Sequence, residues 1–335
     1  MLIKYRVVSD KIKNKKDIQM IETIASVGLP VGEVLRIKKN RILPEHSEKS
    51  AGRISIVTGI HGDELEGQYI CYELQRRINE KKECLKGIID IYPAMNPLGI
   101  DSITRGIPAF DLDMNRLFPG NINGNMTEYL AAEMIRDVEG SDCVLDIHAS
   151  NIYLTEIPQI RINELHEEKL VPLAKETNVD FIWVHGASTV LESTFAYSLN
   201  SIGTPVLVVE MGVGMRITKS YGDQLVDGIF NLMKKLGMWT GETSTPRQPI
   251  ISKNPEDVSY LNAKVSGIFL PSVQHWVELK KGDLIGKIVD PLEGKVLDEV
   301  VAPVEGILFT IRDYPVVGEG SLMGRLLRKE AYQNE

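Results

Sequence analysis

The sequence predicts an α/β protein in which helices flank a mainly parallel, mixed central sheet, followed by a small all-β domain. Short β-branched apolar runs alternate with helical patterns as far as residue 240, which is typical of a sheet built from βαβ units. A polar stretch with Thr, Ser and Pro follows at 240–255, and beyond it short apolar runs alternate with glycine turns. We therefore expect one domain over residues 1–245, with an N-terminal β segment at 1–50, and a β domain over 255–335.

Composition narrows the class of protein before any motif is considered. The 335 residues are 43% hydrophobic and 25% charged, which is ordinary for a globular protein. The net charge of -8 and the lack of a basic stripe argue against a nucleic-acid partner. No apolar run approaches the ~20 residues that span a bilayer, and no signal-peptide core begins the chain, so we expect no membrane partner. Three scattered cysteines indicate reduced thiols and a cytoplasmic protein.

The first chemical motif follows the first core strand, expected over 54–58. The segment Gly59-Ile60-His61-Gly62-Asp63-Glu64 comes next, and a helical pattern begins after it. In open α/β sheets, ligands bind at the carboxyl ends of strands. His61 and Glu64 could converge on one metal ion through a nitrogen and an oxygen, and a third ligand would complete a catalytic zinc site. The same spacing is also that of a solvated ion pair.

A loop with two arginines follows the second expected strand, over 88–92. The segment from Arg105 to Gly120 mixes polar and apolar residues among Pro and Gly, which suits the rim of a pocket. Arg105 and Arg116 could together grip a carboxylate, because guanidinium groups bind carboxylates through two parallel hydrogen bonds. The alternative is that both are surface arginines in a long loop.

Two further strands are expected to end in ionisable residues at the same edge of the sheet. His148 ends the apolar run 144–148, and Glu210 ends the run 205–210. His148 could be a third metal ligand or a hydrogen-bonded core histidine. Glu210 could be the general base that activates metal-bound water, or a surface acid that caps its strand.

The remaining elements of the first domain are short strands and helices that complete the alternating pattern. We expect strands at 24–27, 34–37 and 181–185, and helices at 127–138, 164–177, 189–199 and 221–236.

The C-terminal motifs Ala-x-x-x-Gly-Ile and Lys-Gly-Asp-x-Ile-Gly resemble those of the barrel-sandwich of biotinyl and lipoyl carrier domains. These carriers present a modified lysine in a tight hairpin. Lys295, in Leu292-Glu293-Gly294-Lys295-Val296, is a poor candidate for that position. We therefore expect a carrier-like fold without the carrier function, placed so that it caps the active site.

Four motifs stand in order along the chain: His61-Gly62-Asp63-Glu64, Asp113-Met114-Asn115-Arg116, Asp146-Ile147-His148 and Glu210-Met211-Gly212. Together they resemble the succinylglutamate desuccinylase/aspartoacylase family, a branch of the zinc carboxypeptidase superfamily, over about residues 50–240. The resemblance implies a zinc-carboxypeptidase-like fold and a hydrolase that cleaves the amide bond of a small N-acyl amino acid.

The resemblance also implies a role for each residue of the site. His61, Glu64 and His148 would bind one zinc ion per chain, and Asp113 would orient a zinc-bound histidine. Asn115 and Arg116 would hold the substrate carboxylate, and Arg105 would polarise the scissile carbonyl. Glu210 would take a proton from the zinc-activated water and pass it to the leaving amine.

These motifs do not identify the acyl group or the amino acid of the substrate. Aspartoacylase-like enzymes use further basic residues shortly before the catalytic Glu, whereas 189–205 contains no Arg or Lys. Arg161, His185, Arg216 and Tyr221 are other candidates for the pocket lining. A metallocarboxypeptidase or peptide amidase is the alternative enzyme, and a non-catalytic binding or carrier protein is the alternative of another class. A homo-oligomer is left open, with a dimer as the default.

Overall fold

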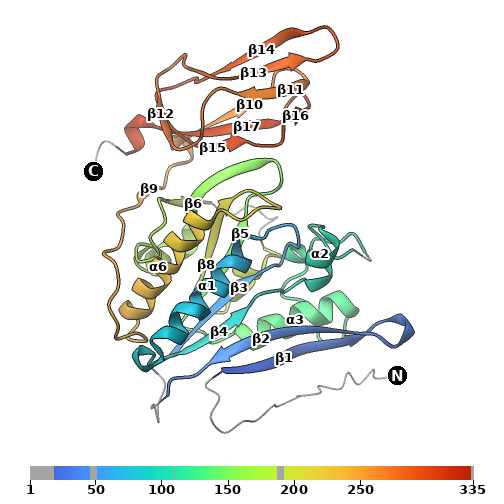
Figure 1. Cartoon of the computed structure of the whole chain (residues 1–335), viewed down its shortest axis with the longest axis vertical. Coiled ribbons are helices and arrows are strands. Elements are labelled where there is room, and N and C mark those ends of the chain that lie inside the picture. The colour runs from blue at the N-terminus through green and yellow to red at the C-terminus, as the bar shows by residue number, and fades with distance from the viewer. Residues whose placement is uncertain (1–18, 46–50, 109, 187–191, 333–335) are drawn as a thin grey trace.

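The computed structural model describes residues 19–45, 51–108, 110–186 and 192–332. The expected segment 1–50, the helix expected at 189–199 and the range 255–335 each include residues outside these ranges. Figure 1 shows the order of the elements along the chain.

The larger part of the chain has the predicted alternation of strands and helices, and it also contains elements that were not predicted, namely the strands at 154–163 and 250–252 and the helix at 97–102. Its strands are β1 (Gln19–Gly28), β2 (Val34–Ile42), β3 (Arg53–Thr58), β4 (Ile88–Tyr92), β5 (Cys143–Ala149), β6 (Leu154–Asn163), β7 (Phe181–His185), β8 (Val206–Gly212) and β9 (Ile250–Ser252). Its helices are α1 (Glu66–Glu80), α2 (Pro97–Ser102), α3 (Met126–Val138), α4 (Glu167–Ala174), α5 (Phe195–Ser201) and α6 (Lys219–Lys235).

The centre of the sheet is parallel and its margins are antiparallel. Strands β4, β3, β5 and β8 lie in that order and pair in parallel. The β1–β2 hairpin joins β4 on one side in antiparallel register, and β6 joins β8 antiparallel on the other. The predicted mixed α/β sheet is confirmed. The β5–β8 register places His148 directly beside Glu210.

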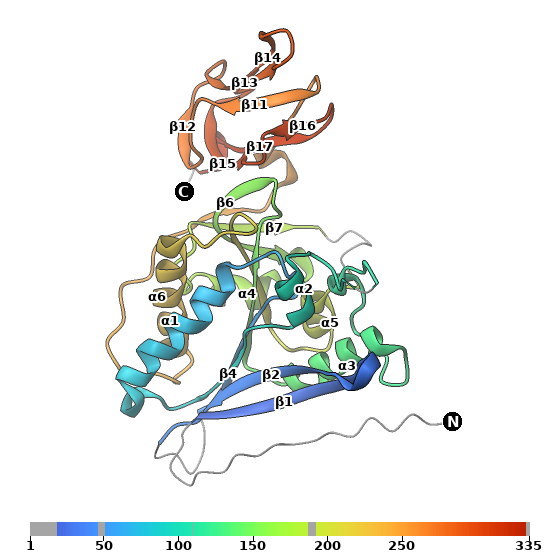
Figure 2. The same ribbon diagram turned by 45° about the vertical axis from the view of Figure 1, so that its right-hand side comes forward.

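Helices cover both faces of this sheet, as expected for a three-layer α/β domain. On one face α1 and α6 pack together over the sheet, where Ile70, Leu74, Leu225 and Ile229 are buried. On the other face α3 and α5 cover the sheet (Figure 2), with Leu130 among their buried residues. The long apolar strands are explained by this double coverage.

The C-terminal part is all β, as the glycine-punctuated pattern predicts. Its strands are β10 (Val258–Asn262), β11 (Gly267–Pro271), β12 (Val277–Leu279), β13 (Leu284–Asp290), β14 (Lys295–Val301), β15 (Gly306–Arg312), β16 (Val316–Val317) and β17 (Leu322–Arg328). A four-stranded sheet in the order β14-β13-β11-β16 packs on β10, β15 and β17 through buried residues that include Phe269, Ile288 and Leu308.

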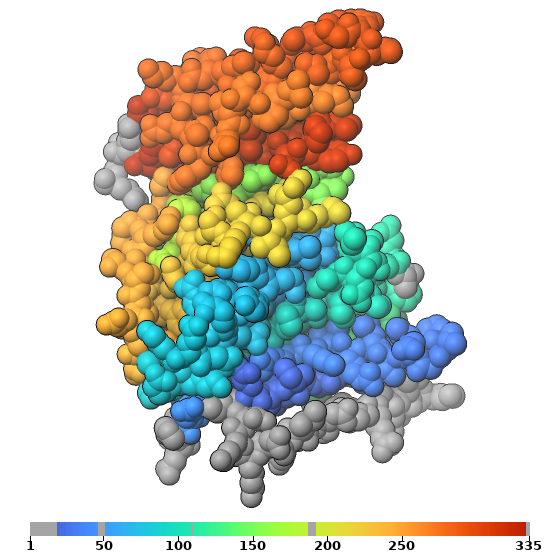
Figure 3. Space-filling model, viewed as in Figure 1, coloured from blue at the N-terminus to red at the C-terminus, as the bar shows by residue number. Residues whose placement is uncertain are grey.

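Strand β6 joins the two parts of the molecule. Its residues 154–156 pair with β15, and its residues 159–163 pair with β7. The central sheet therefore continues into the C-terminal strands, which rest on green and yellow residues of the larger part in Figure 3. Within the described part of the chain, no helix combines the length and the apolar character that a membrane span requires.

Candidate active site

The first motif lies in the loop between β3 and α1, at the carboxyl edge of the sheet. Gly59 turns the chain out of the strand with φ +68°, a conformation that favours glycine. A Cβ at Gly62 would lie 2.0 Å from the carbonyl carbon of Gly99, so only glycine fits where these two loops touch. The turn delivers His61 and Glu64 into the interior, where both are buried.

His61, Glu64 and His148 converge on one point. The Nδ1 atom of His61 lies 2.8 Å from Oε1 of Glu64, and Nδ1 of His148 lies 2.9 Å from Oε2. The two Nδ1 atoms are 3.2 Å apart. One donor atom from each of the three residues lies within 4.8 Å of the others, so the group could hold a metal ion.

The outer nitrogen of each imidazole faces a carboxylate. Nε2 of His61 lies 3.1 Å from Oδ1 of Asp113, and Nε2 of His148 lies 3.2 Å from Oδ1 of Asp146. Histidines that bind metals commonly have their second nitrogen fixed in this way. Asp146 had no role predicted from the sequence, although strand alternation places it on the same face of β5 as His148.

The electrostatics of this group favour a cation. Burial lowers the pKa of His148, but Asp146 and Glu64 outweigh burial and hold that pKa well above its ordinary value. Burial likewise lowers the pKa of His61, and Glu64 with Asp113 raises it overall. Positive charge is thus stabilised where the Nδ1 atoms and the Glu64 carboxylate meet. Two imidazole nitrogens and one carboxylate are also a donor set of catalytic zinc sites, so these residues fit that ion.

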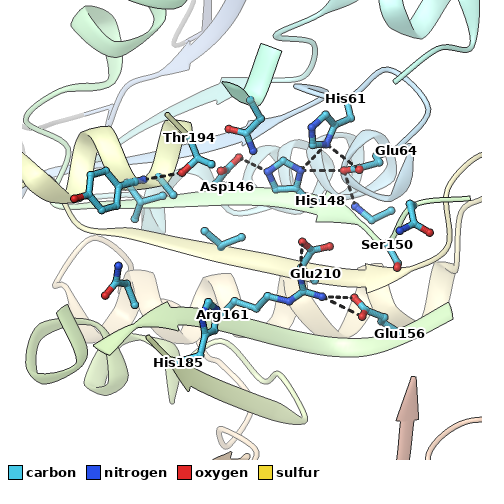
Figure 4. Close-up of a pocket in the computed structure, with 18 of the residues that line it drawn as sticks. His61, Glu64, Asp146, His148, Ser150, Glu156, Arg161, His185, Thr194 and Glu210 are labelled. Atoms are coloured by element: carbon cyan, nitrogen blue, oxygen red, sulfur yellow. Dashed lines mark hydrogen bonds and ion pairs between the residues drawn. The ribbon is translucent and has the colours of Figure 1, made fainter. Parts of the chain in front are cut away.

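Glu210 projects from β8 into the same pocket, with its side chain 15% exposed. It forms an ion pair with Arg161, whose Nη1 lies 3.4 Å from Oε1 of Glu210. Burial raises the pKa of Glu210, and Arg161 offsets part of that rise. Figure 4 shows Glu210 between the two histidines and Arg161. A carboxyl group with a raised pKa is suited to exchange protons near neutral pH.

Arg105, Asn115 and Arg116 also line the pocket. Arg105 donates from Nη1 to Glu64 at 2.9 Å, and its Nε lies 3.4 Å from Asp113. Oδ1 of Asn115 accepts a hydrogen bond from the backbone N–H of Phe195 at 2.9 Å, which fixes the orientation of this side chain. Arg116 donates to the backbone oxygen of Asn115 and is exposed.

The cavity around these groups has a volume of about 520 Å³. All the residues that the sequence indicated for metal binding, catalysis and substrate binding line this cavity, and so do Arg161 and His185. Asp113 is not a lining residue, but it contacts His61, which is. Arg216 and Tyr221 are not among its lining residues. Glu156 and Arg325 also line it, and no local sequence signal indicates them, because Arg325 comes from strand β17 of the C-terminal part.

Comparison with known proteins agrees with this geometry. A family model described as the succinylglutamate desuccinylase/aspartoacylase catalytic domain matches residues 50–236. An N-alpha-acetyl-L-2,4-diaminobutyric acid deacetylase from Halomonas elongata is 28% identical over 268 residues, which are 77% of this chain and 75% of that protein.

Two solved structures share the fold over nearly the whole chain. The product-bound ectoine utilization protein EutE (DoeB) from Ruegeria pomeroyi superposes with a TM-score of 0.78 at 17% identity, over 97% of this chain and 100% of that one. A succinylglutamate desuccinylase/aspartoacylase from Rhodobacter sphaeroides gives a TM-score of 0.78 at 21% identity, over 97% and 99%. The chain belongs to the succinylglutamate desuccinylase/aspartoacylase family of amide-hydrolysing deacylases.

Proposed function

We propose that this protein is a zinc-dependent hydrolase that cleaves the amide bond of a small N-acyl amino acid. The observation that supports the proposal most directly is the placement of His61, Glu64 and His148 in one pocket with Glu210. His148 and Glu210 are paired neighbours on β5 and β8, so one candidate metal ligand and the proposed base lie side by side on central strands of the sheet.

The proposed reaction divides the work between the metal and the protein side chains. Zinc, when bound by His61, Glu64 and His148, supplies a Lewis acid that lowers the pKa of water and polarises a carbonyl. Glu210 accepts a proton from the attacking water and donates it to the leaving nitrogen, which an amine requires in order to depart. Arg105 donates hydrogen bonds to the carbonyl oxygen as negative charge develops there.

The substrate is held by its carboxylate and limited by the size of the pocket. Asn115 and Arg116 provide amide and guanidinium donors in the lining of the pocket, a pairing suited to a carboxylate. A cavity of about 520 Å³ is in the range of small-molecule sites, which favours a single acylated amino acid over a peptide. The similarity to a deacetylase of an acylated diamino acid supports the same substrate class.

A product screen tests the proposal. The zinc-loaded protein is incubated with N-acetyl and N-succinyl amino acids, and in parallel with short peptides that have a free C-terminus. We expect release of free amino acid from the acyl derivatives and little cleavage of peptides. Cleavage of peptides alone would identify a metallocarboxypeptidase, and turnover of neither class by zinc-loaded protein would refute the hydrolase.

Substitution of Arg116 separates substrate binding from chemistry. We expect Arg116→Ala to raise KM by about 10- to 100-fold, because a charge-assisted hydrogen bond is worth about 1.5–3 kcal/mol. The kcat is expected to change by less, since Arg116 contacts the carboxylate rather than the reacting carbonyl. Steady-state kinetics on the best substrate of the screen measure both constants, and an unchanged KM would remove Arg116 from the binding site.

A further inference from the structure

A chain of alternating charges runs from the C-terminal β part into the pocket. Arg325 on β17 forms an ion pair with Glu156 on β6. Glu156 accepts hydrogen bonds at 2.8 and 3.0 Å from Nη2 of Arg161, and Nη1 of Arg161 faces Glu210 at 3.4 Å. The Glu156–Arg161–Glu210 portion is drawn in Figure 4.

The chain of charges lies at the junction of the two parts of the molecule. Glu156 is fully buried, and its backbone pairs with Thr310 of β15, whose hydroxyl also lies 3.4 Å from the Glu156 carboxylate. The guanidinium groups of Arg161 and Arg325 each lie 5.9 Å from the ring of Trp183. The network is therefore built on paired strands and on one shared aromatic ring.

We propose that Arg325 and Glu156 are positioning residues that hold the Arg161 guanidinium against Glu210. The C-terminal β part would then help to arrange the general base, in addition to contributing Arg325 to the lining of the pocket. This inference rests on the proposed function, because it takes Glu210 to be the group that moves protons.

The physical reason is a competition between two carboxylates for one guanidinium. Glu156 and Glu210 both attract Arg161, and a fully buried carboxylate such as Glu156 requires a partner. Arg325 supplies a second cation to Glu156, which leaves the Nη1 edge of Arg161 available to Glu210. Without Arg325, Glu156 would draw Arg161 more strongly and withdraw it from Glu210.

Arg325→Met tests the role of the β part. We expect kcat to fall by about 10- to 100-fold, the range that follows from misplacement of a catalytic group by about 1 Å. KM and zinc content are expected to stay near the wild-type values. Arg325→Lys retains a cation and should recover part of the lost kcat, which loss of packing alone would not explain.

A pH profile distinguishes positioning from a merely structural role. The charged groups that act on Glu210 are Arg161 and Glu156 on β6, His148 on β5, and Glu64. Arg161 favours the ionised form of Glu210 and so lowers its pKa. Arg325→Met should therefore move the acidic limb of kcat/KM to higher pH. Glu156→Gln removes the carboxylate that competes with Glu210 for Arg161. Arg161 should then stabilise ionised Glu210 more strongly, which moves the acidic limb to lower pH.

The matched control is Lys329→Met, which removes an exposed ion pair with Glu305 in the same β part. It should leave kcat, KM and the pH profile unchanged. Zinc content and thermal unfolding are measured for every variant. If Arg325→Met does not fold, Glu156→Gln still decides the question through its pH profile, because an acidic limb that does not move to lower pH would overturn the positioning role.

The possible results separate this inference from the proposed function. A folded, zinc-loaded Arg325→Met with wild-type kcat, or limbs that shift in the same direction in Arg325→Met and Glu156→Gln, would overturn the positioning role. Wild-type turnover by Glu210→Gln would instead overturn the general base itself, whatever the Arg325 variants do.

Discussion

Glu210→Gln is expected to lower kcat by about 10²- to 10⁴-fold, the usual contribution of a general base. The amide of Gln keeps the size and the strand register of the side chain but cannot accept the proton from water. Glu210 is not part of the metal-binding group, so zinc content should remain near one ion per chain. Steady-state kinetics and elemental analysis of the same preparation measure the two quantities together.

The control for Glu210→Gln is Glu192→Gln, which changes an exposed Glu outside the set of pocket-lining residues. Its kinetics should match those of the wild type. If Glu210→Gln lost its zinc as well as its turnover, the residue would belong to the metal site and the base would have to be sought elsewhere.

His148→Ala is expected to abolish stable zinc binding and to reduce turnover by about a thousandfold or more, because zinc contributes several kcal/mol to catalysis. The substitution removes one of three converging donor atoms. It also leaves the buried carboxylates of Glu64 and Asp146 without the imidazole between them. Elemental analysis after dialysis should find close to one zinc per wild-type chain and almost none in the variant.

Two Asp→Asn variants in one loop test the metal site with a smaller change than His148→Ala. Asp113→Asn weakens the contact to Nε2 of His61 and should lower zinc affinity by about 10- to 100-fold. Asp111→Asn makes the same chemical change two residues away, at an exposed position with φ 49° that Asn also tolerates. It should bind zinc as the wild type does. Equal affinities in all three proteins would argue against an orienting role for Asp113.

Removal of zinc from the wild-type protein gives an independent check of the same site. A chelator should abolish turnover and zinc should restore it. Retention of full turnover by chelator-treated protein that elemental analysis shows to be free of metal would refute a metal-dependent mechanism.

Most of the proposed catalytic and metal-binding residues could be predicted, because strand ends and short motifs can be recognised from neighbouring residues in the sequence. His61 and Glu64 are three residues apart in one turn, and His148 and Glu210 each lie near the end of an apolar run. Parallel strands deliver such residues to the same edge of a sheet. The alternating pattern therefore predicted both the α/β fold, which is confirmed, and the neighbourhood in which His61, Glu64 and His148 meet.

The pairing of distant charges could not be predicted from the sequence. Arg161 was a candidate for the pocket lining, but its place could not be assigned from the sequence. Glu156 and Arg325 are 169 residues apart, so no local sequence pattern indicated that they meet. Their meeting depends on β6 pairing with both β8 and β15, so that the central sheet continues into the C-terminal strands, and no periodicity encodes that pairing. The sequence by itself determined the fold class and the motifs that contain the candidate metal ligands, because those depend on short-range spacing. Only the tertiary structure decided which charges oppose Glu210, because strand order and the docking of the β part set those distances.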